Sequence, residues 1–193
     1  MRSWDNRRAS KARLLLRPAI SAAMGGRWAD VGCGDGVFTR LLLEWLAPGS
    51  TVVAIDRDGE ALRRLQEQLP PGQQGQVQTV QADFTETRAI AHLAPFDGLL
   101  FANALHFVRD PLPVLRRWVP LLKEGGTVII IEYNAARGNW AVPHPFRDAT
   151  CLQLMHDAGL DEAQIVNREP SSFMGEIYTA TSVNKRSSMK SVS

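Results

Sequence analysis

Asp30-Val31-Gly32-Cys33-Gly34-Asp35-Gly36 is the stretch that decides the fold of this chain. The apolar residues 28–31 predict a short buried strand that runs into it, and residues 36–46 predict the helix that follows. A tight glycine loop between a strand and a helix lets the backbone approach a ligand closely, and its amides attract negative charge. The stretch therefore predicts a nucleotide-binding turn.

The charges in this loop indicate which kind of nucleotide it binds. The dinucleotide-binding pattern is G-x-G-x-x-G, whereas the loop here is G-x-G-x-G, with Val37 at the position of the third glycine. Carboxylates at Asp30 and Asp35 would repel a pyrophosphate and attract a ligand that carries an ammonium and a sulfonium. These features argue against a nicotinamide-dependent oxidoreductase and favour a cofactor with a positively charged aminoacyl group.

The rest of the chain continues the alternation of strands and helices. Apolar runs predict strands at 51–56, 77–81, 96–102 and 127–132, and the segments around them predict helices at 8–24, 59–69, 111–123 and 147–158. Residues 163–168 and 176–181 predict a closing hairpin with a Pro-Ser-Ser turn. We expect an α/β fold with a Rossmann-like doubly wound sheet, mostly parallel, with an antiparallel C-terminal hairpin strand. Residues 1–183 are expected to form one domain and residues 184–193 a disordered tail.

The segment ADVGCGDGVFT, residues 29–39, resembles the first motif of class I S-adenosylmethionine-dependent methyltransferases, in particular the small-molecule enzymes of types 11 and 25. The resemblance covers about residues 26–133. It implies S-adenosylmethionine as the cofactor and methyl transfer as the reaction. The cofactor-binding residues that it implies are Asp30, Gly32, Cys33, Gly34 and Gly36 in the loop, Asp56 and Arg57 after the second strand, Asp83 and Phe84 at the adenine, and Asn103 beside the methionine portion.

Several of these side chains also have a purely structural interpretation. Asp56 stands 20 residues after Gly36, as a ribose-binding acid does, but an acid there also suits the cap of the next helix. Asp83 could instead cap the segment 85–93, and Phe84 could instead pack in the core. Asp97 begins a strand and is interpreted as structural rather than catalytic.

The methyl acceptor is expected beyond the carboxyl ends of the strands. His106, in the segment NALHF, is the candidate catalytic base, with a histidine packed near Phe107 and Trp118 as the structural alternative. The loop 133–147 suits a planar or carboxylated acceptor, and its alternative is a solvated loop with one anchoring tryptophan. Its aromatic and cationic residues are Tyr133, Arg137, Trp140, His144, Phe146 and Arg147.

Composition narrows the class of protein further. The chain has 45% hydrophobic and 22% charged residues, which is ordinary for a globular domain. Its two cysteines, Cys33 and Cys151, have no metal-binding spacing and are expected to be reduced thiols in a cytoplasmic protein. The sequence predicts no metal site, no secretory signal and no membrane span. We expect a monomer or homodimer.

The N-terminal segment is distinctly basic. Seven Arg and Lys residues against one Asp give residues 1–28 a net charge of +6, so that residues 29–193 carry −4 within the overall +2. This asymmetry predicts an Arg-rich amphipathic helix over an acidic body, with a transit peptide or a contact to an anionic substrate as alternatives. The small overall charge makes a nucleic-acid partner unlikely on these grounds.

Three hypotheses for function follow. The leading one is S-adenosylmethionine-dependent methyl transfer to a small-molecule acceptor through an O, N or C nucleophile. A methyltransferase that acts on a macromolecule, with the basic helix as its docking surface, is the second. The third is a non-catalytic protein of the same fold that regulates a partner.

Overall fold

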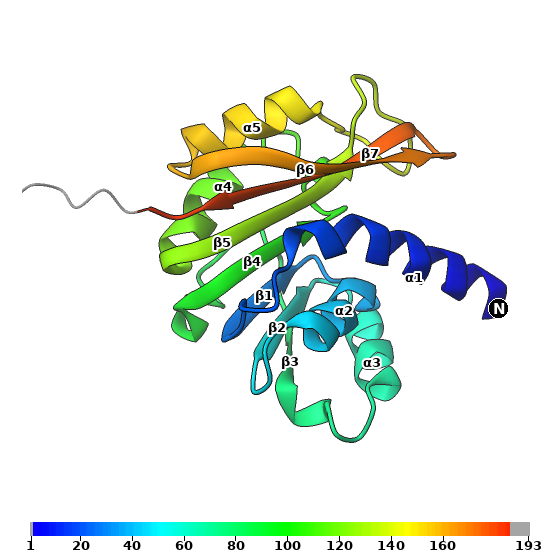
Figure 1. Ribbon diagram of the computed structural model, residues 1–193, viewed down its shortest axis with the longest axis vertical. Coiled ribbons are helices and arrows are strands. Elements are labelled where there is room, and N and C mark those ends of the chain that lie inside the picture. Colours follow the sequence, from blue (N-terminus) through cyan, green and yellow to red (C-terminus); the bar gives the residue numbers. More distant parts are fainter. Residues whose placement is uncertain (1, 186–193) are drawn as a thin grey trace, which may run out of the picture.

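The computed structural model describes residues 2–185, and side chains from residue 7 onward. Its centre is a seven-stranded sheet in the order β3-β2-β1-β4-β5-β7-β6 (Figure 1). The strands are β1 (Arg27–Val31), β2 (Thr51–Asp56), β3 (Val77–Gln81), β4 (Phe96–Ala102), β5 (Leu122–Tyr133), β6 (Asp161–Ser171) and β7 (Gly175–Val183). The first five are parallel, and β7 pairs antiparallel with both β5 and β6. The predicted mostly parallel sheet with a C-terminal hairpin is confirmed.

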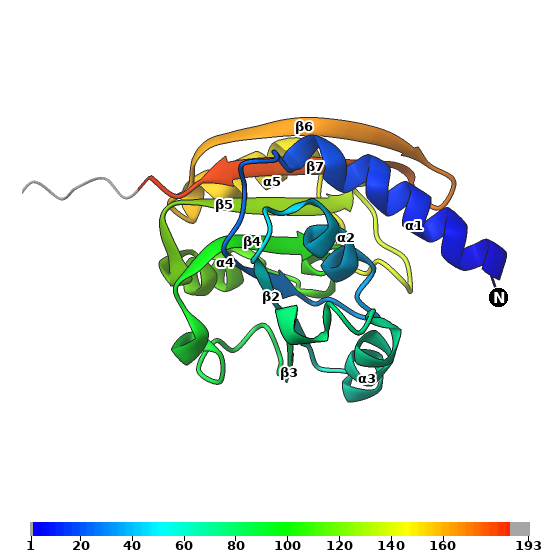
Figure 2. The ribbon, with the colours of Figure 1, turned by 60° about the horizontal axis from the view of Figure 1, so that its bottom comes forward.

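Helices cover both faces of the sheet, as expected for a doubly wound fold (Figures 1 and 2). The helices are α1 (Arg2–Leu16), α2 (Val37–Trp45), α3 (Gly59–Gln68), α4 (Leu112–Trp118) and α5 (Asp148–Asp157). Side chains alternate along each strand, so that Leu100 and Ile129 pack with α1 and α2, whereas Leu99 and Ile130 pack with α4 and α5. Each strand thus contributes to two apolar layers.

Two helices end earlier than predicted, and proline explains both ends; the first of them also begins earlier, at Arg2. The helix predicted at 8–24 is α1, which ends at Leu16 and is followed by a 3-10 turn over Arg17–Ala19. Pro18 lacks the N–H that would continue the α-helix. The helix predicted at 111–123 is α4, which ends at Trp118 and gives way to a 3-10 turn, Val119–Leu121, that contains Pro120.

The C-terminal hairpin is longer than predicted. Pro170 and Ser171 belong to β6, and the turn lies at residues 172–174 instead of the predicted Pro-Ser-Ser. β6 is an edge strand, where a proline disturbs no ladder on its outer side. Asn184, the first residue of the predicted tail, is buried, and its side chain donates to the carbonyl of Lys123 at 3.0 Å. The remaining predicted tail, residues 186–193, lies outside the described residues.

Within residues 2–185, none of the helices combines the length and the apolar character that crossing a membrane requires.

Candidate functional site

A cavity of about 700 Å³ opens at the carboxyl ends of the parallel strands. Residues that follow β1, end β2, follow β4 and end β5 all line it: Gly32, Asp56, Asn103 and Tyr133. The order of the strands reverses between β1 and β4. In open α/β sheets, ligands bind beyond the carboxyl ends of the strands at such a point. The other walls come from α1, α2, the segment after β4 and the β6–β7 turn.

The glycine loop has the backbone that only glycine adopts readily. Gly32, Gly34 and Gly36 all have positive φ angles, of 76°, 53° and 74°. A Cβ at Gly32 would lie 2.8 Å from the Ala104 Cβ, and one at Gly36 would lie 2.3 Å from Leu65. At Gly34 a Cβ would meet no protein atom within 4 Å, although Gly34 lines the cavity. Two glycines therefore allow close packing, and Gly34 leaves open space where a ligand would lie.

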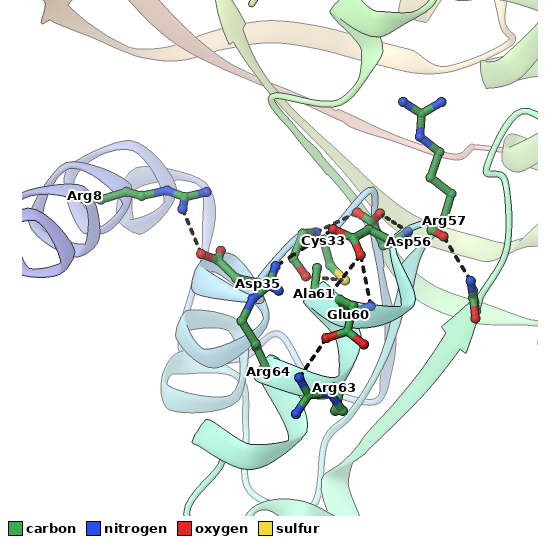
Figure 3. Close-up of polar contacts among 12 residues, drawn as sticks. Arg8, Cys33, Asp35, Asp56, Arg57, Glu60, Ala61, Arg63 and Arg64 are labelled. Carbon is green, nitrogen blue, oxygen red and sulfur yellow. Dashed lines mark hydrogen bonds and ion pairs between the residues drawn. The ribbon is translucent and has the colours of Figure 1, made fainter. Parts of the chain in front are cut away.

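Asp56 is joined to this loop. Its Oδ2 accepts from the Gly34 amide at 2.7 Å, and its Oδ1 accepts from the Asp58 amide at 2.9 Å. Figure 3 shows the Asp56 carboxylate between the loop and the start of α3. Asp56 does not cap α3, because Asp58 is the N-cap and accepts from Glu60 and Ala61. The helix-capping alternative for Asp56 is thus wrong, and the acid stands at the cavity wall.

Asp30 is fully buried beneath the loop. The Thr39 hydroxyl donates to its Oδ2 at 2.6 Å, while its Oδ1 has no hydrogen-bond partner among the described residues. Burial raises the pKa of this carboxyl to about 7, against the lowering effect of the Thr39 bond. A nearby positive charge would favour the ionised form, so Asp30 suits a site that receives a cation.

Asn103 provides a second buried acceptor. It follows β4 with a left-handed backbone, φ 54°, and its Oδ1 has no hydrogen-bond partner within the described part of the chain. Asn103 lines the large cavity, and buried polar groups are rarely left unpaired. Asn103 therefore offers an acceptor oxygen at the cavity wall, whereas Asp30 lies beneath the loop and lines neither of the two cavities that contain Gly32.

A second cavity of about 250 Å³ shares Gly32, Asp56, Asn103 and Phe107 with the first. The predicted adenine-binding residues Asp83 and Phe84 line it. A Cβ on Gly32 would lie 3.5 Å from the Phe84 ring, so the ring faces the loop. The structure thus brings the predicted nucleoside residues together in one continuous depression.

The alternatives for the adenine-binding residues are partly confirmed as well. Asp83 Oδ1 accepts from both the amide and the hydroxyl of Thr85, so the acid also closes a turn, and these bonds lower its pKa. Phe84 is partly buried against the core. Arg57 lines the smaller cavity, and its carbonyl accepts from Gln81.

The cysteines are free and buried. Cys33 lines the cavity, but its side chain packs with Leu62 and Leu65 under α3, and burial raises its pKa. Cys33 as a whole is only 8% exposed. Asp97 accepts from the Arg27 amide and from Lys123, which confirms the structural interpretation of this acid. Among residues 2–185, no cluster of three or more potential metal ligands is present.

His106 forms a buried pair that the sequence did not predict. Its Nδ1 lies 2.7 Å from Oε2 of Glu132 on β5, and its amide donates to Oε1 of the same carboxylate at 3.2 Å. Glu132 is fully buried and His106 is 2% exposed. Nδ1 is engaged, so Nε2 is the ring nitrogen left for a ligand in the cavity that His106 lines.

Of the two neighbours named in the structural alternative for His106, the structure confirms Phe107 and contradicts Trp118. The His106 ring contacts Phe107, with centroids 4.3 Å apart, and lies 6.1 Å from the ring of Tyr133. Trp118 instead contacts Phe96 and Phe101 in the core. A glutamate in the apolar run IIIEY was the only sequence signal for the buried pair.

The loop 133–147 contributes less to the cavity than predicted. Tyr133, Ala141 and Val142 line it, whereas Trp140 and Arg137 do not. Trp140 is 92% exposed, so the anchoring-tryptophan alternative is also wrong. Phe146 is buried in the core and is the aromatic residue that anchors this loop. Hydrophobicity alone did not distinguish these two aromatic residues.

Helix α1 supplies the positive charge of the cavity. Arg7, Arg8 and Lys11 line it, and the helix runs past the carboxyl ends of the strands (Figure 2). Arg8 pairs with Asp35 of the glycine loop at 2.9 Å, a contact that Figure 3 shows. The predicted basic helix therefore lies over an acidic part of the body, and it also forms a wall of the site.

Comparison with known proteins identifies the family. Residues 29–130 match the family described as "Methyltransferase domain". The trans-aconitate 2-methyltransferase of Rhodopseudomonas palustris (strain HaA2) is 37% identical over 131 residues, which are 66% of this chain and 46% of that protein. The ubiquinone biosynthesis O-methyltransferase of Xanthomonas campestris pv. campestris (strain B100) is 29% identical over 154 residues, 73% of this chain and 60% of that protein. The chain spans about half the length of the trans-aconitate relatives it matches.

Solved structures show the same fold. The N-methyltransferase NodS from Bradyrhizobium japonicum WM9 superposes with a TM-score of 0.71 at 17% identity, over 95% of this chain and 97% of that chain. NodS in complex with S-adenosyl-L-homocysteine gives 0.69 at 18% identity, over 93% of this chain and 86% of that chain. The matched residues 29–130 contain the glycine loop, Asp56, Asp83, Asn103 and His106. The chain belongs to the methyltransferase domain family, the class I S-adenosylmethionine-dependent methyltransferases.

Proposed function

We propose that this chain transfers a methyl group from S-adenosylmethionine to a small-molecule acceptor whose nucleophile carries a proton. The observation that carries the proposal is the single cavity that joins the glycine loop and Asn103 to the His106–Glu132 pair. A cofactor held by the loop and a proton acceptor thus face the same space. The names of the relatives, which refer to trans-aconitate and to ubiquinone biosynthesis, support a small acceptor.

The cofactor-binding residues have distinct parts in this proposal. S-adenosylmethionine supplies a methyl group activated by a sulfonium. Asp30 and Asn103 would accept hydrogen bonds from its aminoacyl end or face its positive charge, because each has a buried oxygen that lacks a partner among the described residues. Asp56 would bind the ribose while it holds the Gly34 amide, and Asp83 and Phe84 would line the adenine.

His106 is the proposed base, and Glu132 is the residue that orients it. In the proposed tautomer the Glu132 carboxylate accepts from Nδ1–H, and Nε2 of the neutral imidazole would take a proton from the acceptor. His106 Nε2 would take this proton as the acceptor's nucleophile receives the methyl group, and the bound cofactor would supply the methyl group and keep the bonding electron pair as a neutral sulfide.

Binding and methyl transfer test this proposal separately. Thermal-shift measurements should show stabilisation by S-adenosylmethionine and S-adenosylhomocysteine and none by NAD. Transfer of labelled methyl groups should then be measured on a panel of hydroxy and amino acids, phenols and polycarboxylates. Stabilisation by NAD, or by neither sulfur ligand, would refute the cofactor assignment. Binding without transfer to any member of the panel would refute the acceptor class.

We also propose that the chain acts in the cytoplasm as a monomer or homodimer and without a metal ion. The free, buried thiols of Cys33 and Cys151 support a reducing compartment. Size-exclusion chromatography with light scattering, and activity in the presence of a chelator, test the other two points.

A further inference from the structure

Positive charge gathers where α1 lines the large cavity. Arg7, Arg8 and Lys11 line the cavity together with Ala12 and Leu15 of the same helix. Their spacing of three and four residues places these side chains on one helix face. The wall of the cavity is therefore cationic where α1 passes it.

Two of these three cations already have acidic partners. The Arg8 guanidinium lies 2.9 Å from Asp35, and Lys11 Nζ lies 3.2 Å from Glu169 on β6. No carboxylate among the described side chains pairs with Arg7. A guanidinium that faces a cavity offers two parallel N–H donors, the geometry that a carboxylate accepts. Of the three cations of this wall, Arg7 is therefore the one that could pair with an anionic ligand without first breaking an ion pair to a described side chain.

Apolar surface surrounds the cationic wall. Phe107 and Phe173 line the cavity with 56% and 49% of their surface exposed, and Phe173 stacks edge-on against Tyr133 at 5.8 Å. Val142 and Ile177 line the same space. Exposed phenylalanines beside a cavity indicate contact with an apolar ligand body, because such residues are otherwise turned inward.

We propose that the acceptor is a carboxylate on an apolar body, and that Arg7 binds this carboxylate with Lys11 as a second contact. This rests on the proposed function, since the acceptor must share the cavity with the cofactor. One guanidinium without a carboxylate partner among the side chains of residues 7–185, and one ammonium partly neutralised by Glu169, match a singly charged group better than a phosphate dianion. The anchor comes from α1 and the base, His106, from the segment after β4, so the two fix both ends of the acceptor.

The test uses simple carboxylates, and its readout is binding instead of turnover. Benzoate, trans-cinnamate and octanoate are titrated by calorimetry or ligand-observed NMR into the protein saturated with S-adenosylhomocysteine, each beside its neutral amide. Arg7→Gln removes the proposed anchor. Arg13→Gln is the matched control, because Arg13 lies on the same helix but pairs with Glu44 on α2 and does not line the cavity.

At least one carboxylate should bind more tightly than its amide, and Arg7→Gln should weaken that binding about tenfold or more, as expected for loss of a charge-assisted hydrogen bond. Arg13→Gln should bind like the wild type, and S-adenosylhomocysteine affinity should be unchanged in both variants. Equal binding of acids and amides, no binding of any acid, or wild-type affinity in Arg7→Gln would overturn the inference. Loss of S-adenosylhomocysteine binding in the wild type would instead overturn the proposed function.

Discussion

Gly34 and Asp56 belong to successive strand-to-helix turns and are joined by a hydrogen bond of 2.7 Å, from the glycine amide to the carboxylate Oδ2. The bond ties the loop after β1 to the end of β2, two neighbouring parallel strands. The acid therefore shapes the loop as well as the wall of the cavity. A change at Asp56 is expected to alter both, which makes it the first position to test.

Asp56→Ala should weaken S-adenosylhomocysteine binding by about 1.5–3 kcal/mol, the range for hydrogen bonds to charged groups. Calorimetry measures the affinity, and circular dichroism confirms the fold. Asp58→Ala is the control, because Asp58 caps α3 through the Glu60 and Ala61 amides. It should cost about 0.5–2 kcal/mol of stability and leave the affinity intact. Unchanged affinity in a folded Asp56→Ala protein would refute the ribose assignment.

His106→Ala should lower kcat mainly at low pH, where the acceptor does not ionise unaided. The loss expected for removal of a general base is about 10²–10⁴-fold. The pH profile of kcat measures it, once an acceptor has been identified.

The same variant leaves Glu132 buried without its partner, which costs about 3–5 kcal/mol of stability for a broken buried pair. His106→Gln keeps an amide donor for the carboxylate and serves as the companion variant. It should fold more stably than His106→Ala and remain as impaired at low pH. A wild-type profile in His106→Gln would show that the histidine is structural.

Asp30 should make stability depend on pH. Burial raises its pKa in the folded state to about 7 from 3.8, so between these values the folded protein binds a proton that the unfolded chain has lost. The free energy of unfolding of the wild type, relative to Asp30→Asn, should therefore fall as pH rises from about 4 to about 7, by up to about 1.4 kcal/mol per pH unit. Urea unfolding at several pH values measures this difference. A difference that is constant with pH would contradict the buried, proton-bearing state of Asp30.

The sheet was predictable, and so were the strand-end positions of the proposed cofactor-binding residues, because local sequence signals fix them. The glycines follow the apolar run of β1, and the acids end or follow the apolar runs of β2 and β3. Their place at strand ends can therefore be read from the sequence. The acceptor end was less predictable, because it depends on which side chains the fold turns inward. Trp140 and Phe146 look alike in sequence, yet one is exposed and the other buried. Glu132 stands in an apolar run, and only the path of the segment after β4 places His106 against it.

The central claim is that the glycine loop holds the cofactor, and Gly34 tests it most directly. Gly34 and Gly49 both have positive φ, 53° and 85°, and a Cβ at either meets no atom within 4 Å, but only Gly34 lines the cavity. Gly34→Val and Gly49→Val should thus have similar backbone strain. Calorimetric titration with S-adenosylhomocysteine should show no binding to Gly34→Val and wild-type affinity in Gly49→Val. Wild-type affinity in a folded Gly34→Val protein would contradict the account.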